Sequence, residues 1–138
     1  MRNIYYYIVI LICISVSTNA QNISCYHLHN GRFKIIDSVH KSFVLIERKD
    51  SVEKQYIYKN DTSQYDMKLL FKIEWQNDCT YKAYLVENII HTKRGDKYIP
   101  TGKRVLTNRI MLTDNNSYVV YTDMNTGVKF ANRVLIIK

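Results

Sequence analysis

The clearest pattern of hydrophobic and polar positions in this chain lies between residues 65 and 75, where the side chains alternate in character. Polar residues fill most of the even positions, with Leu70 as the exception. The odd positions hold five apolar side chains: Met67, Leu69, Phe71, Ile73 and Trp75. A β-strand with one buried face has this two-residue period, whereas the period of a helix would mix the two sets on every face. The segment therefore predicts a strand.

Seven further segments, rich in Tyr, Ile, Val, Phe and Thr, have weaker patterns that suit pleated, half-buried surfaces. They cover residues 31–36, 42–48, 52–58, 80–88, 104–113, 117–123 and 128–137. Short polar turns separate most of them, and the one long connection is residues 89–103. Eight strands at this spacing predict an all-β domain, a single antiparallel meander that closes into a small barrel and so leaves no open edges. A β-sandwich is the alternative.

Residues 1–20 have the three-part pattern of a cleavable secretory signal. Arg2 supplies a short positive start, and residues 4–16 are apolar apart from three tyrosines. Thr18 and Ala20 place small side chains at −3 and −1 of a cut before Gln21. The apolar run is well short of the roughly 20 residues of a bilayer-spanning helix. The sequence therefore predicts export to the periplasm or the exterior, with one domain over residues 21–138 and no transmembrane span after cleavage.

Signal removal also changes the cysteine count. It takes away Cys13 and leaves Cys25 and Cys79, and an even pair in an exported chain predicts one disulfide. Two free thiols are one alternative. Lipidation of Cys25 is another, since Ser24 suits the position before a lipidated cysteine, although Asn22 is polar where an apolar residue is needed.

Charge adds one candidate surface. The formal net charge is +8, and loss of Arg2 with the signal leaves +7. Most of this charge is dispersed along the predicted strands, as in ordinary solvated strand faces, but one cluster lies in the long connection, against the single acid Asp96: Lys93, Arg94, Lys97, Lys103 and Arg104. A loop with this charge is a candidate site for an anionic partner. A solvated hairpin loop is the alternative, and we expect no nucleic-acid partner.

Two cysteine-centred blocks resemble a known family. Residues 25–34, Cys-Tyr-His-Leu-His-Asn-Gly-Arg-Phe-Lys, resemble the opening of a family of small exported bacterial proteins, which starts with a cysteine and continues to Asn-Gly-x-Phe-Lys. Residues 73–81 look like the strand of the same family that ends in Trp and is followed by Asp-Cys and an aromatic residue. The resemblance implies a lipocalin-like or similar small barrel with Cys25 paired to Cys79. It implies no activity.

Aromatic side chains suggest what the barrel interior contains. Four of them are candidates for lining a ligand cavity or filling the core: Phe71, Trp75, Tyr81 and Tyr84. Tyr56 and Tyr58 could join them. An eight-stranded barrel is either filled by side chains or holds one small ligand, and the aromatic content suits both.

No motif of an enzyme occurs in the sequence. It has no Gly-x-Ser-x-Gly elbow, no His-Glu-x-x-His pair and no P-loop. His27 and His29 would share one face of a strand, but no acid close in sequence completes a metal site with them. We therefore expect no catalytic residues, no cofactor and no metal.

These observations favour a non-enzymatic binding module for a small apolar ligand. The alternative is an interaction or inhibitor protein of the cell envelope, which would use the basic loop or a sheet surface to bind a protein or a polyanion. A cavity of several hundred Å³ with an open mouth would favour the ligand carrier. A filled barrel with a coherent positive patch would favour the interaction protein.

Overall fold

The structure is a computed structural model that describes residues 24–60, 63–112 and 114–138. The predicted signal, with its cleavage site before Gln21, lies outside the described residues. Within these ranges the elements are one 3₁₀ turn and nine strands: η1 (Tyr26–Leu28), β1 (Gly31–Asp37), β2 (Ser42–Lys49), β3 (Val52–Lys59), β4 (Met67–Asn77), β5 (Thr80–Thr92), β6 (Gly95–Tyr98), β7 (Val105–Leu112), β8 (Ser117–Met124) and β9 (Lys129–Ile137).

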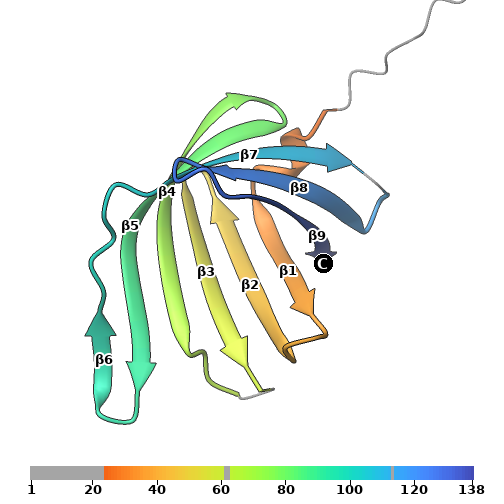
Figure 1. Cartoon of the computed structure of the whole chain (residues 1–138). Coiled ribbons are helices and arrows are strands. Elements are labelled where there is room, and N and C mark those ends of the chain that lie inside the picture. Colours follow the sequence, from red (N-terminus) through yellow and green to blue (C-terminus); the bar gives the residue numbers. More distant parts are fainter. Residues whose placement is uncertain (1–23, 61–62, 113) are drawn as a thin grey trace, which may run out of the picture.

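Eight of these strands form a closed antiparallel β-barrel. Each pairs with the next of the eight along the chain, so that β5 pairs directly with β7 and the short β6 is not part of the barrel. The last strand, β9, pairs with β1. Pairing of β4 with β5 completes the circuit (Figure 1). The predicted all-β meander is therefore confirmed, and the structure is a barrel, not a sandwich.

The prediction that residues 89–103 form one long connection was wrong. β5 continues to Thr92 and turns into β6, which pairs with β5 alone. Two features hid this hairpin. Val86 is an extra residue in β5, opposite the Leu70–Phe71 step of β4, so the inward positions change from odd to even along β5. All four residues of β6 are exposed, so that strand has no alternating pattern to detect.

The barrel is closed more tightly at one end than at the other. β1 and β9 share three residue pairs, from Arg32–Ile137 to Lys34–Leu135, and then separate. β5 pairs with β7 only over Thr80–Tyr84. We call the end near these pairs the closed end, and the opposite end, where β1 and β9 diverge, the open end. Figure 1 shows β7, β8 and β9 diverging there from the other strands.

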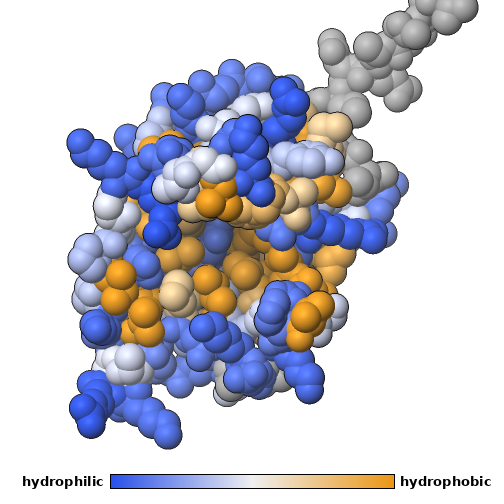
Figure 2. Space-filling view, viewed as in Figure 1, coloured by the Kyte–Doolittle hydropathy of each residue, from blue (hydrophilic) through white to orange (hydrophobic). Residues whose placement is uncertain are grey.

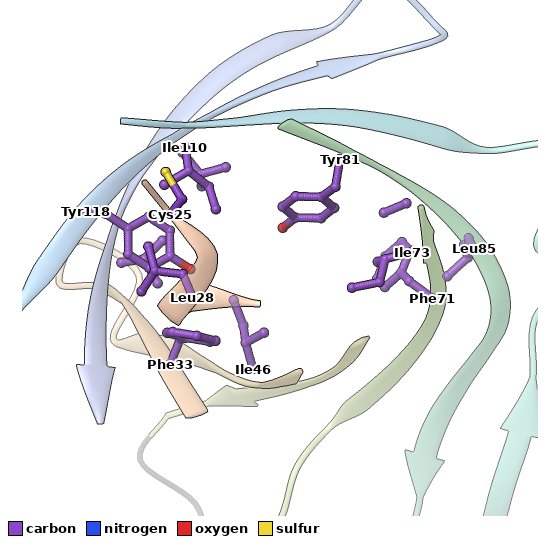
Figure 3. Close-up of a cluster of buried hydrophobic side chains, with 13 residues drawn as sticks. Cys25, Leu28, Phe33, Ile46, Phe71, Ile73, Tyr81, Leu85, Ile110 and Tyr118 are labelled. Atoms are coloured by element: carbon purple, nitrogen blue, oxygen red, sulfur yellow. The ribbon is translucent and has the colours of Figure 1, made fainter. Parts of the chain in front are cut away.

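The hydrophobic core fills the closed end. Fully or almost fully buried side chains, such as Phe33, Phe71 and Tyr118, point into the barrel from strands all round it (Figure 3). The N-terminal segment plugs this end, because Leu28 and Cys25 are buried within the same cluster (Figure 3). The predicted Cys25–Cys79 disulfide is confirmed; it ties the plug to the turn between β4 and β5, with the two Cα atoms 5.0 Å apart.

The Asn-Gly-x-Phe part of the opening block has a physical explanation. Gly31 starts β1 with a φ of 147°, which side-chain-bearing residues rarely adopt. A Cβ atom there would also lie 3.1 Å from the ring of Phe33. Glycine therefore lets the chain leave the plug and enter β1 while the Phe33 ring folds back beneath it.

Candidate functional site

A buried charged pair lies inside the barrel, where β2 and β3 meet the closed end. Arg48 and Glu53 are cross-strand partners on β2 and β3, and their side chains are only 1% and 2% exposed. The Nε of Arg48 donates to Glu53 Oε2 over 2.8 Å, and Nη2 lies 2.8 Å from the same oxygen. Position 48 follows Val44 and Ile46 on the inward face of β2, so the alternation of the strand directs the guanidinium into the interior.

Neighbouring groups satisfy the rest of this pair. Arg48 Nη1 donates to the carbonyl of Leu28 in the plug over 2.7 Å, and Nη2 donates to the Tyr81 hydroxyl over 2.8 Å. Tyr81 donates in turn to Glu53 Oε2 over 3.2 Å, and the amide of Gln55 donates to Oε1 over 2.7 Å. A buried ion pair is tolerated only when its remaining hydrogen-bonding groups find partners in this way.

Burial and the charged pair together determine the pKa values of Arg48 and of the two nearby tyrosines. Burial opposes the charge of Arg48, but the influence of Tyr81 and Glu53 outweighs burial and raises its pKa, so the guanidinium stays charged. Burial raises the pKa of Tyr81 well above the ordinary value, although Arg48 opposes the change. Burial likewise raises the pKa of Tyr118 to about 12. Both phenols are therefore neutral at physiological pH.

Aromatic rings enclose the guanidinium. Its central carbon lies 4.7 Å from the ring centre of Tyr81, 5.0 Å from that of Phe33 and 5.7 Å from that of Trp75. Trp75 is stacked in turn on His29 of the plug, with ring centres 3.5 Å apart. The closed half of the barrel is thus filled by side chains.

A small cavity lies on the open side of this network. Its volume is about 90 Å³, with Arg48, Glu53, Tyr81 and Tyr118 at its floor. Ile35, Gln55, Leu106, Phe130 and Asn132 are among the side chains nearer the open end. A volume of this size holds about three water molecules or one compact chemical group. It is well below the several hundred Å³ expected of a ligand carrier, so the enclosed cavity alone does not support that function.

Beyond this cavity the interior widens into a cup lined by apolar side chains. Most inward-facing residues of the closed half are at most 7% exposed, with Trp75 and Ile136 as partly buried exceptions, whereas most apolar ones near the open end are only partly buried. The partly buried set includes Ile35, Val44, Ile57, Leu69 and Leu106. Figure 2 shows this face of the molecule hollowed, with hydrophobic side chains around the hollow. We call the hollow lined by these partly buried residues the cup, and the small cavity lies beneath it.

Of the four aromatic residues predicted to lie inside the barrel, three do so and Tyr84 does not. Phe71 and Tyr81 are buried in the interior, and Trp75 packs against the core. Tyr84 instead points outward, where its hydroxyl donates to Glu74 over 3.0 Å, and this hydrogen bond raises its pKa. Tyr56 and Tyr58 also face outward, because they pair with Leu45 and Phe43 on the outer face of β2.

The predicted anion-binding residues all lie on the surface near the open end. Lys93 and Arg94 form the turn of the β5–β6 hairpin, Lys97 lies in β6, and Lys103 and Arg104 precede β7. All five are exposed. They are spread over a hairpin and a loop.

His27 and His29 do not lie on a strand as expected. His27 is in η1 and exposed, while His29 caps that turn, stacks on Trp75 and donates from Nε2 to the carbonyl of Asp78 over 2.9 Å. Among the residues that the structure describes, no three His, Cys, Asp or Glu side chains are grouped as metal ligands.

Sequence reasoning missed the pair that organises the interior. The signal was present, since Arg48 and Glu53 occupy inward positions of β2 and β3 and flank a tight turn. A charged residue at an inward-facing, otherwise apolar position of a strand, with an opposite charge across the hairpin, predicts a buried pair.

Two larger depressions, of about 870 and 560 Å³, lie on the outer faces of β1–β3 and of β7–β9 and are open to solvent.

Comparison of the chain with protein-family models, with curated proteins and with solved structures found no match. The family resemblance of the two cysteine-centred blocks therefore stays a prediction. No helix within the described ranges has both the length and the apolar character of a membrane span.

Proposed function

We propose that this protein is an exported, non-enzymatic binding module that holds a small, largely apolar ligand in the cup. The observation that carries the proposal is the gradient of burial along the barrel. Most apolar side chains that face inward are buried at the closed end, Trp75 and Ile136 being partly buried, and most of those at the open end remain in contact with water. Covering such a surface with an apolar ligand is favourable by roughly 25 cal/mol for each Å² removed from water.

The cavity beneath the cup limits the kind of ligand. Only a compact group fits into about 90 Å³, so the body of the ligand would rest on the apolar wall of the cup. The floor is polar but internally paired, since Arg48 and Glu53 neutralise each other. A strongly charged ligand would gain little there. Asn132 and the Gln55 amide, which also donates to Glu53, line the cavity, and this suits a ligand with one neutral hydrogen-bonding group.

The barrel supports this proposal as a rigid frame. The Arg48–Glu53 pair fixes β2 and β3 below the cup, and the Leu28 carbonyl and the disulfide fix the plug behind it. Export is proposed from the sequence, and the disulfide is compatible with an oxidising compartment. Mass spectrometry of the protein recovered from its host should show Gln21 as the first residue.

The proposal is tested with the fluorescent apolar probe N-phenyl-1-naphthylamine and two matched variants. Val44→Trp places a large side chain on the inward wall of the cup, whereas Val52→Trp places it on the outer face of the adjacent strand, where Val52 is 39% exposed. We expect saturable binding of the probe that Val44→Trp weakens at least tenfold and Val52→Trp changes less than twofold. Circular dichroism and the thermal midpoint verify that both variants fold.

Two results would contradict the proposal. One is probe binding that both variants leave unchanged, which would place the probe outside the cup. The other is an absence of saturable probe binding together with native mass spectra, of protein purified from its host, that show no bound small molecule.

A further inference from the structure

The hairpin of β5 and β6 stands apart from the barrel. β6 pairs with β5 alone, and it lies at the end of the strand order. Figure 1 shows the hairpin extending past the ends of the neighbouring strands at the lower left of the view. Its outer edge has no strand partner among the described residues.

The outer edge of β6 presents backbone groups suited to another strand. Ile99 N–H bonds the carbonyl of Asn88 on β5, so Ile99 faces β5. Neighbouring residues of an antiparallel strand alternate in direction, and the N–H and C=O of Tyr98 and Asp96 therefore point away from β5. These four groups are a short template for strand addition.

The hairpin carries uncompensated positive charge. Lys93, Arg94 and Lys97 have no acidic side chain within ion-pair distance in the described part of the chain. Asp96, the one acid between Ile89 and Lys103, is occupied, since its Oδ1 accepts from His91 Nδ1 over 2.6 Å. An incoming chain therefore meets backbone donors and acceptors with a positive field around them.

The hairpin is also held in place before any partner arrives. The Gln64 side-chain amide lies 2.6 Å from His91 Nε2, so His91 links the β3–β4 connection to Asp96. The Thr92 hydroxyl donates to the carbonyl of Gly95 over 2.6 Å and closes the turn. A template that is already ordered loses little conformational freedom on binding.

We propose that the outer edge of β6 is a docking site for an extended acidic segment of a partner protein, which adds to the sheet as a further strand. A peptide is the occupant that the geometry favours, because only a peptide backbone matches the donors and acceptors of Asp96 and Tyr98. Acidic side chains on that peptide complement Lys93, Arg94 and Lys97. The exposed ring of Tyr98 gives it an apolar contact.

Positive charge on an edge strand has a second known role, which is to prevent pairing between copies of the same chain. The two roles predict different behaviour. A protective edge does not bind acidic peptides, and its neutralisation causes self-association. A docking edge binds an acidic peptide through its backbone.

The test uses a synthetic peptide of four Glu-Val repeats and the same peptide with alternate backbone amides N-methylated. We expect the unmodified peptide to bind and to slow hydrogen exchange of the Asp96 and Tyr98 amides, and the methylated peptide to bind at least tenfold more weakly. The double variant Arg94→Glu/Lys97→Glu should weaken binding at least tenfold. The control Lys72→Glu, an exposed lysine on β4, should change it less than twofold.

Three outcomes overturn the proposal. The methylated peptide binds as tightly as the unmodified one, or polyphosphate competes with the peptide while the Asp96 and Tyr98 amides gain no protection from exchange. In the third, the wild type does not bind the peptide, and self-association of Lys93→Gln/Arg94→Gln/Lys97→Gln then identifies a protective edge. Binding of N-phenyl-1-naphthylamine is measured on every hairpin variant. The cup lies inside the barrel, so probe binding should be unchanged, and failure of the docking site and failure of the ligand site stay distinguishable.

Discussion

Arg48 and Glu53 form an ion pair inside the barrel, with the guanidinium Nη2 2.8 Å from Glu53 Oε2 and both side chains almost fully buried. The two residues lie directly opposite each other on β2 and β3. Their position separates the filled half of the barrel from the cup. The pair therefore has a structural role, and under the proposed function it also sets the depth to which the ligand enters.

Removing one partner of this pair should be much more damaging than removing both. Glu53→Gln or Arg48→Met leaves an uncompensated group in the interior, and we expect the free energy of unfolding to fall by about 3–5 kcal/mol. The double variant Arg48→Met/Glu53→Leu should regain most of this loss, because no buried charge remains. Urea denaturation measures all three, and a double variant as unstable as the sum of the single changes would refute the argument.

Stability should fall at alkaline pH because of the buried phenols. Burial raises the pKa of Tyr118 to about 12 in the folded protein, above the ordinary value of 10. Between these two values the unfolded chain loses the proton first, so stability is fully present below pH 10 and decreases as the pH rises toward 12. A shift of this size corresponds to about 3 kcal/mol.

The variant Tyr118→Phe should reduce this alkaline loss without removing it, since burial raises the pKa of Tyr81 as well. Tyr121→Phe, at a position 53% exposed, is the matched control and should leave the profile as it is. Free energies of unfolding measured from pH 8 to 11 give the comparison. Equal slopes for the wild type and Tyr118→Phe would count against the assignment.

The disulfide should contribute strongly to stability because it links residues 54 positions apart. On the chain-entropy model, its removal in Cys25→Ser/Cys79→Ser costs about 4 kcal/mol. Trp75, the single tryptophan, stacks on His29 in the plug and so reports whether the plug stays docked. We expect a lower unfolding midpoint and an altered Trp75 emission. Unchanged values of both would show that the plug docks without the bond.

Much of the barrel follows from local patterns. The alternation of Leu69, Phe71 and Ile73 identified β4 and its inward face, and the turns placed seven other strands within a few residues of their observed bounds. The even cysteine pair gave the disulfide. Where the alternation is broken, as at Val86, or lacking, as in β6, the prediction was wrong.

The candidate site was less predictable, because it depends on which strands diverge. The sequence analysis placed Tyr81 and Tyr84 in one group, although residues three positions apart on a strand face opposite sides. The register of β5 against β4 and β7 shows that Tyr81 is the one directed into the barrel and Tyr84 the one at the surface. Nothing in the sequence indicated that Leu28 would supply the carbonyl that Arg48 requires. That contact joins residues 20 positions apart and exists only once the plug has docked.

Most strands and the faces that they bury could be predicted from the sequence, since these rest on neighbouring residues and on the two-residue period of extended chain. The disulfide followed from the cysteine count, because only Cys25 and Cys79 lie outside the predicted signal. How the barrel closes depends on contacts between distant segments. β1 and β9 meet over three pairs and then separate, so one half of the interior is packed around Arg48 and Glu53 while the other stays open. Divergence of strands from opposite ends of the chain is set by the twist and packing of the whole sheet, and no local pattern records it.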